Sequence, residues 1–335
     1  MKNYLLGCDW GTSSFRLRLI NSQDQQFIDE ITSQEGVAST FTAWKKQEEP
    51  GRISREQFFR QQLQKQIERL SGKTGKKLDG LPVVISGMAS SSIGMDEVAY
   101  ATLPFPVDGS QASVKRLDPQ AHLPHDILLI GGVCSEYDVM RGEETQLIGL
   151  LALLDTKHYS IKNTIVLFPG THSKHVYVQD GQLIDFQTFM TGEIFNLMAH
   201  HSILKDSVEA PRSTAFSRNE LEAFKSGIHE DNATSILNSL FRVRTNQLFS
   251  KFSKRENALY LSGLLIGNEL KSLVDKRDWP LIVCSGTNLY ELYKLGMQEL
   301  HLAERTTTIS ADMLDKATIA GQVKIMQSQL MSMSK

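Results

Sequence analysis

The feature that most constrains the fold is a strand–turn–strand segment that occurs once in each half of the chain. Residues 4–9 (YLLGCD) have the apolar character of a short strand ending at an acidic residue, and residues 15–20 (FRLRLI) alternate apolar and basic side chains like its partner. Residues 164–178 (TIVLFPGTHSKHVYV) repeat this form. We therefore predict two lobes that each begin with a hairpin. A chain of 335 residues suits two lobes, since one hydrophobic core rarely grows beyond about 250–300 residues.

Strands, loops and helices alternate through the rest of the chain. Apolar runs predict strands at 81–86, near 127–133 and at 281–286. The spacing of apolar residues predicts helices over 55–70, from near 142, over 193–204, about 231–250 and 255–276, from 288, and over 315–330. This pattern indicates an α/β protein with a mixed sheet in each lobe and a cleft between the lobes. We predict lobes at 1–157 and 158–314, with the terminal helix 315–335 packing back on the first.

Composition excludes several classes of function. The net charge of −2 offers no general attraction to nucleic acid or to anionic lipid, and no run of about 20 apolar residues could span a membrane. The N-terminal segment is too short in apolar residues for a signal peptide. The three cysteines, Cys8, Cys134 and Cys284, are far apart and form no C-x-x-C pair, as expected of buried thiols in a reducing compartment. We expect a cytoplasmic protein without a nucleic-acid or membrane partner.

The turn of the first hairpin is a candidate phosphate site. Backbone N–H groups and short hydroxyls in a glycine-containing turn can approach phosphate oxygens, while the carboxylate of Asp9 at the strand end can hold Mg²⁺ through water. The candidate residues are Gly11, Thr12, Ser13 and Ser14. The alternative interpretation is that these residues only make a hairpin turn.

The turn of the second hairpin occupies the equivalent place. Its candidate residues are Gly170, Thr171, His172, Ser173 and Lys174. Two such turns can contact one phosphate chain and position it for in-line transfer. Lys174 would add a point charge, although a lysine at a strand start is often simply solvated. His172 and His175 make a poor metal pair, because residues three apart on a strand point to opposite faces.

Two helix starts carry further candidates. Glu143 and Glu144 could supply the carboxylate that accepts a hydroxyl proton in phosphoryl transfer, although acidic residues also favour helix N-termini for electrostatic reasons alone. Arg141 could bind a substrate carboxylate through two parallel hydrogen bonds. After the strand at 281–286, the residues Gly286, Thr287 and Asn288 suit a nucleotide but also an ordinary strand–helix turn with Asn288 as a cap.

Several longer motifs, in order along nearly the whole chain, are similar to those of one known family. They are DWGTSSFRLRLI, VVISGMASSSIG, VMRGEETQLIG, PGTHSKHV, FMTGE and YLSGLLIG. The sequence resembles the 2-dehydro-3-deoxygalactonokinases of the sugar kinase/Hsp70/actin superfamily. The resemblance implies a ribonuclease-H-like, actin-like ATPase fold and Mg²⁺-dependent transfer of the ATP γ-phosphoryl group to the 6-hydroxyl of 2-dehydro-3-deoxy-galactonate, in galactonate breakdown.

The resemblance also implies roles for individual residues. Related kinases place a catalytic Asp after a Gly at a helix start, where this sequence has Gly142-Glu143-Glu144. We prefer Glu143 as the base and keep Glu144 as the alternative. The first lobe would hold the first phosphate turn and the sugar acid, with Gly87, Met88, Ser91 and Arg141 as substrate contacts, and the second lobe would hold the adenosine. Rival interpretations are a kinase of another sugar or sugar acid and a non-kinase ATPase that binds a partner. A homodimer remains open.

Overall fold

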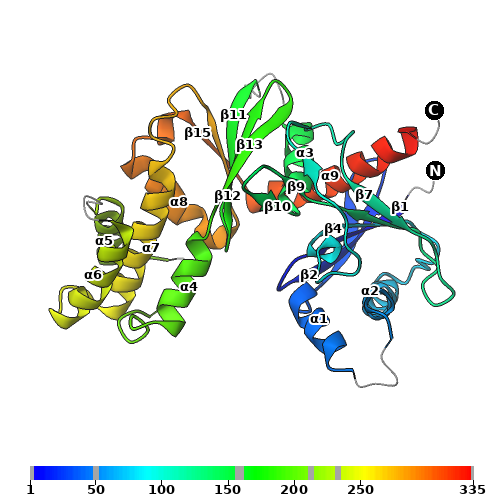
Figure 1. The fold of residues 1–335 in the computed structure, drawn as a ribbon, viewed down its shortest axis with the longest axis horizontal. Helices are drawn as coiled ribbons and strands as arrows, with labels where there is room; N and C mark the ends of the chain where they lie inside the picture. Colours follow the sequence, from blue (N-terminus) through cyan, green and yellow to red (C-terminus); the bar gives the residue numbers. More distant parts are fainter. Residues whose placement is uncertain (1–3, 48–52, 155–161, 210–214, 231–234, 333–335) are drawn as a thin grey trace. The chain divides into compact units, whose positions relative to one another are not determined.

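The computed structural model describes residues 4–47, 53–154, 162–209, 215–230 and 235–332. The chain divides into two compact units. The first contains residues up to 161, together with 179–185 and the terminal segment from 312, and the second contains 162–178 and 186–311. The predicted boundary at residue 157 lies outside the described residues. Figure 1 shows the elements of each unit.

The first unit is built on a six-stranded mixed sheet. Its strands, in spatial order, are β3 (Phe27–Ser33), β2 (Phe15–Asn21), β1 (Tyr4–Trp10), β4 (Val83–Gly87), β8 (Ile127–Ile130) and β7 (Val114–Leu117). The strands β1, β2 and β3 are antiparallel neighbours, whereas β1, β4 and β8 run parallel. The predicted hairpin at the start of the chain is therefore present, and the parallel strands place their carboxyl ends at one edge.

Helices cover both faces of this sheet (Figure 1). They are α1 (Val37–Lys45), α2 (Arg55–Thr74), α3 (Glu143–Leu153) and α9 (Ala311–Ser332). Alternation along β1 sends Cys8 and Trp10 into a core with the apolar stripe of α2. Gly7 faces α9 instead, where a Cβ would come within 2.4 Å of the Gln322 amide oxygen. The Gln322 amide nitrogen donates to the Cys8 carbonyl at 2.9 Å, which fastens α9 to the sheet.

α9 also crosses α3 at very short range. A Cβ on Gly149 would lie 1.8 Å from the Ala317 carbonyl oxygen, and one on Gly321 would lie 1.9 Å from that of Thr145. Because only glycine allows this approach, the two helices are in backbone contact. This contact supports the first turn of α3, which carries two of the predicted site residues.

The second unit repeats the arrangement of the first. Its strands, in spatial order, are β15 (Thr306–Ile309), β14 (Leu281–Cys284), β11 (Asn163–Phe168), β12 (Ser173–Gln179) and β13 (Gln182–Phe189). In both sheets the first strand is central and the next two strands along the chain follow on one side. Two strands parallel to the first follow on the other side, β4 and β8 in the first sheet and β14 and β15 in the second. Within the second sheet β11, β14 and β15 are parallel. The strand–turn–strand pattern that occurs twice in the sequence therefore corresponds to a sheet topology that occurs twice in the structure.

Five helices pack on the second sheet or on each other (Figure 1). They are α4 (Thr191–His201), α5 (Arg218–Ile228), α6 (Ile236–Leu248), α7 (Lys254–Lys271) and α8 (Thr287–Glu299). α5 and α7 cross closely, since a Cβ on Gly263 would lie 2.0 Å from the Phe224 carbonyl oxygen. Buried residues of α5, α7 and α8 form one core with β11 and β14.

The remaining short elements are β5 (Ala101–Thr102), β6 (Phe105–Pro106), β9 (Val133–Cys134), β10 (Val139–Met140) and the 3₁₀ turns Met88–Ser90 and Ala303–Arg305. The strands β10, β9 and β5 form a three-stranded sheet that leads the chain into α3. β6 pairs with the start of β13, Leu183 opposite Phe105. Among the helices that the structure describes, none is long and apolar enough to cross a membrane.

Candidate active site

The first hairpin turn is shaped by its contact with α1. The Gly11 N–H donates to the Ser14 carbonyl at 2.9 Å, which closes the turn. The carbonyls of Gly11 and Thr12 accept from the first amides of α1, at 2.9 and 3.1 Å. Gly36, before α1, makes this possible, because a Cβ there would lie 2.3 Å from the Thr12 oxygen. The side chains of Thr12, Ser13 and Ser14 are exposed, so they are free to face a ligand.

Asp9 lies at the carboxyl end of β1, on the α9 face of the sheet, among charged neighbours. Burial is the main cause that raises the pKa of this carboxyl group, and the charges of Asp315 and Glu143 raise it further. The charges of Arg16 and Arg18 act in the opposite direction. Both arginines contact Asp315, with Arg18 at 3.2 Å. Asp9 is therefore a buried carboxyl group with two arginines and two further carboxylates within electrostatic range.

Two glycines lie beside Asp9 where the chain leaves β4 and enters α3. Gly87 has φ of +89° and Gly142 has φ of +109°, conformations that side chains rarely adopt. A Cβ on Gly87 would lie 2.8 Å from the Trp10 carbonyl and 3.4 Å from an Asp9 carboxylate oxygen, and one on Gly142 would lie 3.4 Å from the Gly87 Cα. The structure thus brings the ends of β1, β4 and β10 together at the carboxyl edge of the first sheet.

Glu143 and Glu144 have different surroundings although they are adjacent at the start of α3. Glu144 is 1% exposed, and its two carboxylate oxygens accept from the Gly142 N–H at 2.7 Å and the Thr145 hydroxyl at 2.9 Å. Burial and the neighbouring Glu143 charge raise the pKa of Glu144 to about 7. Glu143 is only half-buried, accepts from the Arg141 N–H at 3.1 Å, and acts electrostatically on Asp9.

Arg141 is held in a fixed orientation. One terminal nitrogen donates to the Ser90 hydroxyl at 2.6 Å, the other donates to the Val98 carbonyl at 3.2 Å, and the guanidinium lies 4.3 Å from the centre of the Tyr100 ring. Its Nε is buried without a hydrogen-bond partner among the described residues. Such a stacked, half-buried guanidinium is preorganised to bind an anion through its remaining N–H groups.

The loop after β4 lies close to this arginine. Gly87 is at the strand end, and Met88 begins the 3₁₀ turn. The Ser91 hydroxyl donates to the Met88 carbonyl at 2.7 Å and therefore closes the loop on itself. Ser90, which sequence reasoning did not single out, is the serine that contacts Arg141.

The second hairpin turn rests on the first turn of α4. Glu193 donates its N–H to the Thr171 carbonyl at 3.0 Å, and its carboxylate contacts the His172 ring. A Cβ on Gly192 would lie 2.7 Å from the Gly170 carbonyl oxygen and 2.8 Å from the Thr171 Cα. Thr171 and His172 are exposed at the tip. Gly192 and Glu193 belong to the motif FMTGE, which the sequence analysis could identify only as a family motif. In the structure this motif supports the second hairpin turn.

The two remaining residues of the second turn are buried. Ser173 is 0% exposed and its hydroxyl accepts from the Gly170 N–H at 3.3 Å. Lys174 is 5% exposed, and its ammonium group donates to the His172 carbonyl at 3.3 Å. Lys174 therefore stabilises the turn through a backbone carbonyl and is not a solvated surface lysine.

The predicted adenosine segment follows β14. Ser285 is buried and donates to the Gly286 carbonyl at 3.0 Å. Gly286 precedes α8 with no atom within 4 Å of a Cβ placed on it, so the backbone is open there. The side chains of Thr287 and Asn288 lie outside the described residues.

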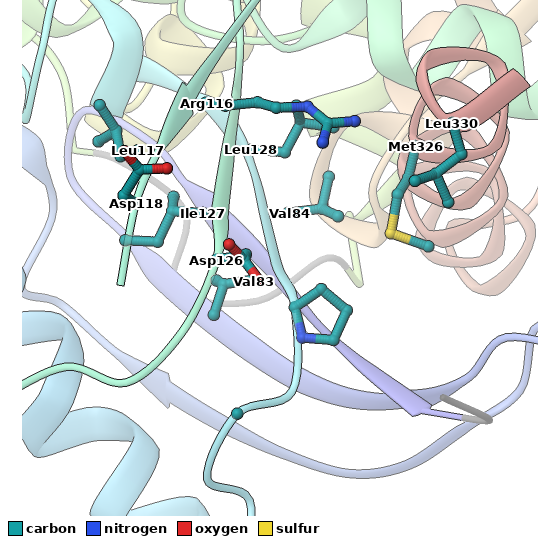
Figure 2. A pocket seen from close by; sticks show the side chains of 12 residues that line it. Val83, Val84, Arg116, Leu117, Asp118, Asp126, Ile127, Leu128, Met326 and Leu330 are labelled. Atoms are coloured by element: carbon teal, nitrogen blue, oxygen red, sulfur yellow. The ribbon is translucent and has the colours of Figure 1, made fainter. Parts of the chain in front are cut away.

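A pocket in the first unit lies away from all these residues. It has a volume of about 460 Å³ and is lined at the starts of β4 and β8 by Val83, Val84, Ile127 and Leu128, with Met326 of α9 at its side (Figure 2). The predicted substrate residues follow the opposite, carboxyl ends of these strands, where α/β proteins usually bind ligands. This pocket is therefore not the candidate active site.

The described residues contain no group of three or more His, Cys, Asp or Glu side chains arranged to hold a metal ion by themselves. A magnesium ion bound through a single carboxylate, water and phosphate oxygens would not need such a group. Asp9, at the carboxyl end of β1, is the residue that would hold such an ion, and Arg16 and Arg18 already supply positive charge beside it.

Comparisons with known proteins agree on one family. A family model described as 2-keto-3-deoxy-galactonokinase matches residues 9–325. The 2-dehydro-3-deoxygalactonokinase of Escherichia coli (strain K12) is 31% identical over 253 residues, covering 70% of this chain and 80% of that protein. A provisionally named 2-dehydro-3-deoxygalactonokinase of Rhizobium meliloti (strain 1021) is 30% identical over 334 residues, covering 96% and 97%.

Solved structures agree with the fold. A crystal structure of a provisionally named 2-dehydro-3-deoxygalactonokinase from Sinorhizobium meliloti has a TM-score of 0.75 at 27% identity and covers 96% of this chain and 99% of its own. An activator of 2-hydroxyisocaproyl-CoA dehydratase from Clostridium difficile, with bound ADPNP, has a TM-score of 0.50 at 13% identity, covering 99% and 98%. The second likeness concerns the fold alone. The predicted α/β fold class is confirmed, and the chain belongs to the 2-keto-3-deoxy-galactonokinase family.

Proposed function

We propose that this chain transfers the γ-phosphoryl group of ATP to the 6-hydroxyl of 2-dehydro-3-deoxygalactonate, in galactonate breakdown. Family membership over residues 9–325 supports the kinase activity and the sugar acid. The observation that carries the proposal in the structure is the pair Gly142-Glu143. A Cβ on Gly142 would lie 3.4 Å from the Gly87 Cα, and the half-buried Glu143 carboxylate acts electrostatically on Asp9.

Glu143 is the proposed general base. A base must reach the hydroxyl proton, so it needs a carboxylate that faces the ligand side of the helix start. The Glu144 carboxylate is 1% exposed and both of its oxygens are engaged, so its role is to hold the turn before α3. Glu143 is more exposed and within electrostatic reach of Asp9. These contacts support Glu143 over Glu144.

Arg141 is the proposed partner of the sugar-acid carboxylate. The hydrogen bonds to Ser90 and Val98 use two of the five guanidinium N–H groups, and stacking on Tyr100 fixes the plane in which the others lie. A carboxylate would then be bound at little cost in side-chain ordering. The loop Gly87–Ser91 follows the same strand end and is proposed to contact the sugar.

The residues proposed to bind phosphate groups of ATP are Gly11, Thr12, Ser13 and Ser14 of the first hairpin turn and Gly170, Thr171, His172, Ser173 and Lys174 of the second. Gly286, Thr287 and Asn288 are proposed for the nucleoside side. Asp9 would hold Mg²⁺ through water, and the ion would neutralise charge on the phosphates. Exposure of the side chains of Thr12, Ser13, Ser14, Thr171 and His172 supports the assignment of these five residues. Ser173 and Lys174 are buried and would act by holding the turn.

The test of this function is a coupled assay of ADP release with Mg²⁺-ATP and a panel of acceptors. We expect ADP release to depend on 2-dehydro-3-deoxygalactonate and to be far weaker with neutral sugars, which lack the carboxylate for Arg141. Equal turnover with a neutral sugar would support the rival kinase, and ATP hydrolysis that ignores every acceptor would support the non-kinase ATPase.

We also propose a cytoplasmic location. All three cysteines are free, and Cys8 and Cys284 are buried, as suits a reducing compartment. Recovery of the native protein in a secreted fraction would contradict this location.

A further inference from the structure

Glu269 is a buried carboxylate to which neither the family motifs nor the proposed chemistry gives a role. It lies on α7, is 1% exposed, and sits among apolar residues of the second unit. Burying a carboxylate is costly unless hydrogen bonds replace its water. A carboxylate in this core therefore needs hydrogen-bond donors, and the donors around Glu269 indicate its role.

Three donors from three different elements converge on this carboxylate. The Tyr293 hydroxyl on α8 donates to Oε2 at 2.8 Å, and the Thr191 hydroxyl at the start of α4 donates to the same oxygen. His175 on β12 contacts Oε1 through Nε2 at 3.1 Å. The His175 Nδ1 is buried without a partner among the described residues, so the neutral ring with its proton on Nε2 is the form that leaves no N–H unpaired.

The hydrogen bonds form a chain with one direction that ends at the second hairpin turn. A carboxylate only accepts, so the single hydroxyl proton of Tyr293 goes to Glu269. The Ser173 hydroxyl, 3.0 Å from Tyr293, then donates to the tyrosine oxygen, and the Ser173 oxygen accepts from the Gly170 N–H at 3.3 Å. Each bond polarises the next, so the loss of one link weakens the others.

A second connection reaches the same turn through α4. Thr191 is followed by Gly192, whose backbone lies against Gly170 and Thr171, and by Glu193, whose N–H donates to the Thr171 carbonyl. Glu269 therefore fixes the turn from two sides, once through Ser173 and once through the start of α4.

We propose that Glu269 is a positioning residue that holds residues 170–172 in the conformation that binds phosphate. The inference rests on the proposed ATP site at this turn. Because Glu269 is buried, it acts through Ser173 and Thr191 and does not touch the nucleotide.

The test uses the variants Glu269→Gln and Tyr293→Phe, with Asn257→Ala as the matched control. Glutamine keeps the shape but has one acceptor oxygen in place of two, so it cannot accept from Tyr293, Thr191 and His175 as the carboxylate does. Phenylalanine removes only the hydroxyl that links Ser173 to Glu269. Asn257 lies on the same helix, is 0% exposed and donates to two backbone carbonyls, at Ser207 and Val243, away from the turn. Its loss should cost stability without disturbing the turn.

We expect both network variants to raise the KM for ATP by about tenfold, which corresponds to the loss of one hydrogen bond to a charged group, with the KM for the sugar acid within about twofold of its original value. Binding of ADP should weaken more than binding of AMP. The control should lower the melting temperature and leave the KM for ATP unchanged. An unchanged KM for ATP in Tyr293→Phe, or an equal rise in the control, would overturn the inference.

Amide hydrogen exchange separates this inference from the proposed function. If the native protein does not turn over ATP, the function fails, while faster exchange at the amides of residues 170–173 in Tyr293→Phe than in the control would still support the network. Unchanged exchange there would refute it. If Glu269→Gln does not fold, the KM for ATP and the amide exchange are both measured in Tyr293→Phe, which removes one hydroxyl from an otherwise intact core.

Discussion

Replacing Glu144 by Gln is expected to stabilise the protein above neutral pH, because it removes a carboxylate that the fold buries. The Gln amide fits the same contacts: its oxygen can accept from the Gly142 N–H, and its N–H₂ can donate to the Thr145 hydroxyl, which reverses its role. The substitution therefore leaves the shape of the turn intact and removes only the ionisable group at position 144.

The magnitude follows from the pKa of Glu144, which is raised from 4.5 to about 7. Below pH 4.5 the group is neutral in both states. Between pH 4.5 and 7 the unfolded chain gives up a proton that the folded chain keeps, so the unfolding free energy falls as pH rises, by about 3 kcal/mol in all. Above pH 7 the penalty is constant. From near pH 5 to near pH 8, the advantage of Gln over Glu should grow by about 2.5 kcal/mol.

The measurement is urea unfolding of both proteins at these two pH values, followed by tryptophan fluorescence. A Trp279→Phe background leaves Trp10 and Trp44 as reporters, and both belong to the first unit, which contains Glu144. Titrating groups other than Glu143, whose charge acts on Glu144, contribute equally to the two proteins and cancel in the difference. A stability difference that does not change with pH would refute the reasoning, as would a Gln variant that is the less stable protein at the higher pH.

Two further substitutions test the supports of the site. Gly36→Ala places a Cβ 2.3 Å from the Thr12 carbonyl oxygen; we expect a loss of about 1–3 kcal/mol in thermal unfolding and a higher KM for ATP, and a native-like KM would contradict the role of the turn. Arg141→Lys keeps the charge but loses the paired N–H groups and the stacking on Tyr100; steady-state kinetics should show a rise of about tenfold or more in the KM for the sugar acid with little change for ATP. An unchanged KM for the sugar acid would refute the proposed carboxylate contact.

The parts of the fold that depend on local sequence could be predicted. The hairpins formed by β1 with β2 and by β11 with β12 follow from short apolar runs separated by turn residues. The buried apolar face of α2 follows from the helical spacing of its apolar residues. α5 was missed although its signal was present: Ser217 and Glu220 form a capping box at its start.

Other elements could not be predicted, because distant residues determine them. α1 has no side-chain cap, and its first amides are bonded by the carbonyls of Gly11 and Thr12, from a turn that precedes it by more than twenty residues. The strands β5, β9 and β10 have two residues each, which is too short for an alternation of apolar and polar residues to be recognised. They are defined only by their pairing with one another.

The candidate site shows the same division. Glycine-containing turns and a Gly-Glu-Glu helix start can be recognised as candidates from residue types. The sequence could not separate Glu143 from Glu144, because their difference is one of burial and of hydrogen bonds formed after folding. Glu269 was not singled out at all, since a glutamate on a helix usually faces solvent and its four-element network has no local pattern.

The central claim, a sugar-acid kinase whose base is Glu143, is tested most directly by the turnover of Glu143→Gln beside Glu144→Gln, with ATP binding measured by calorimetry. The account predicts that Glu143→Gln loses about 10²- to 10⁴-fold in acceptor-dependent turnover while its affinity for ATP stays close to that of the native protein, and that Glu144→Gln loses far less. Near-native turnover in Glu143→Gln, with the large loss in Glu144→Gln instead, would contradict it.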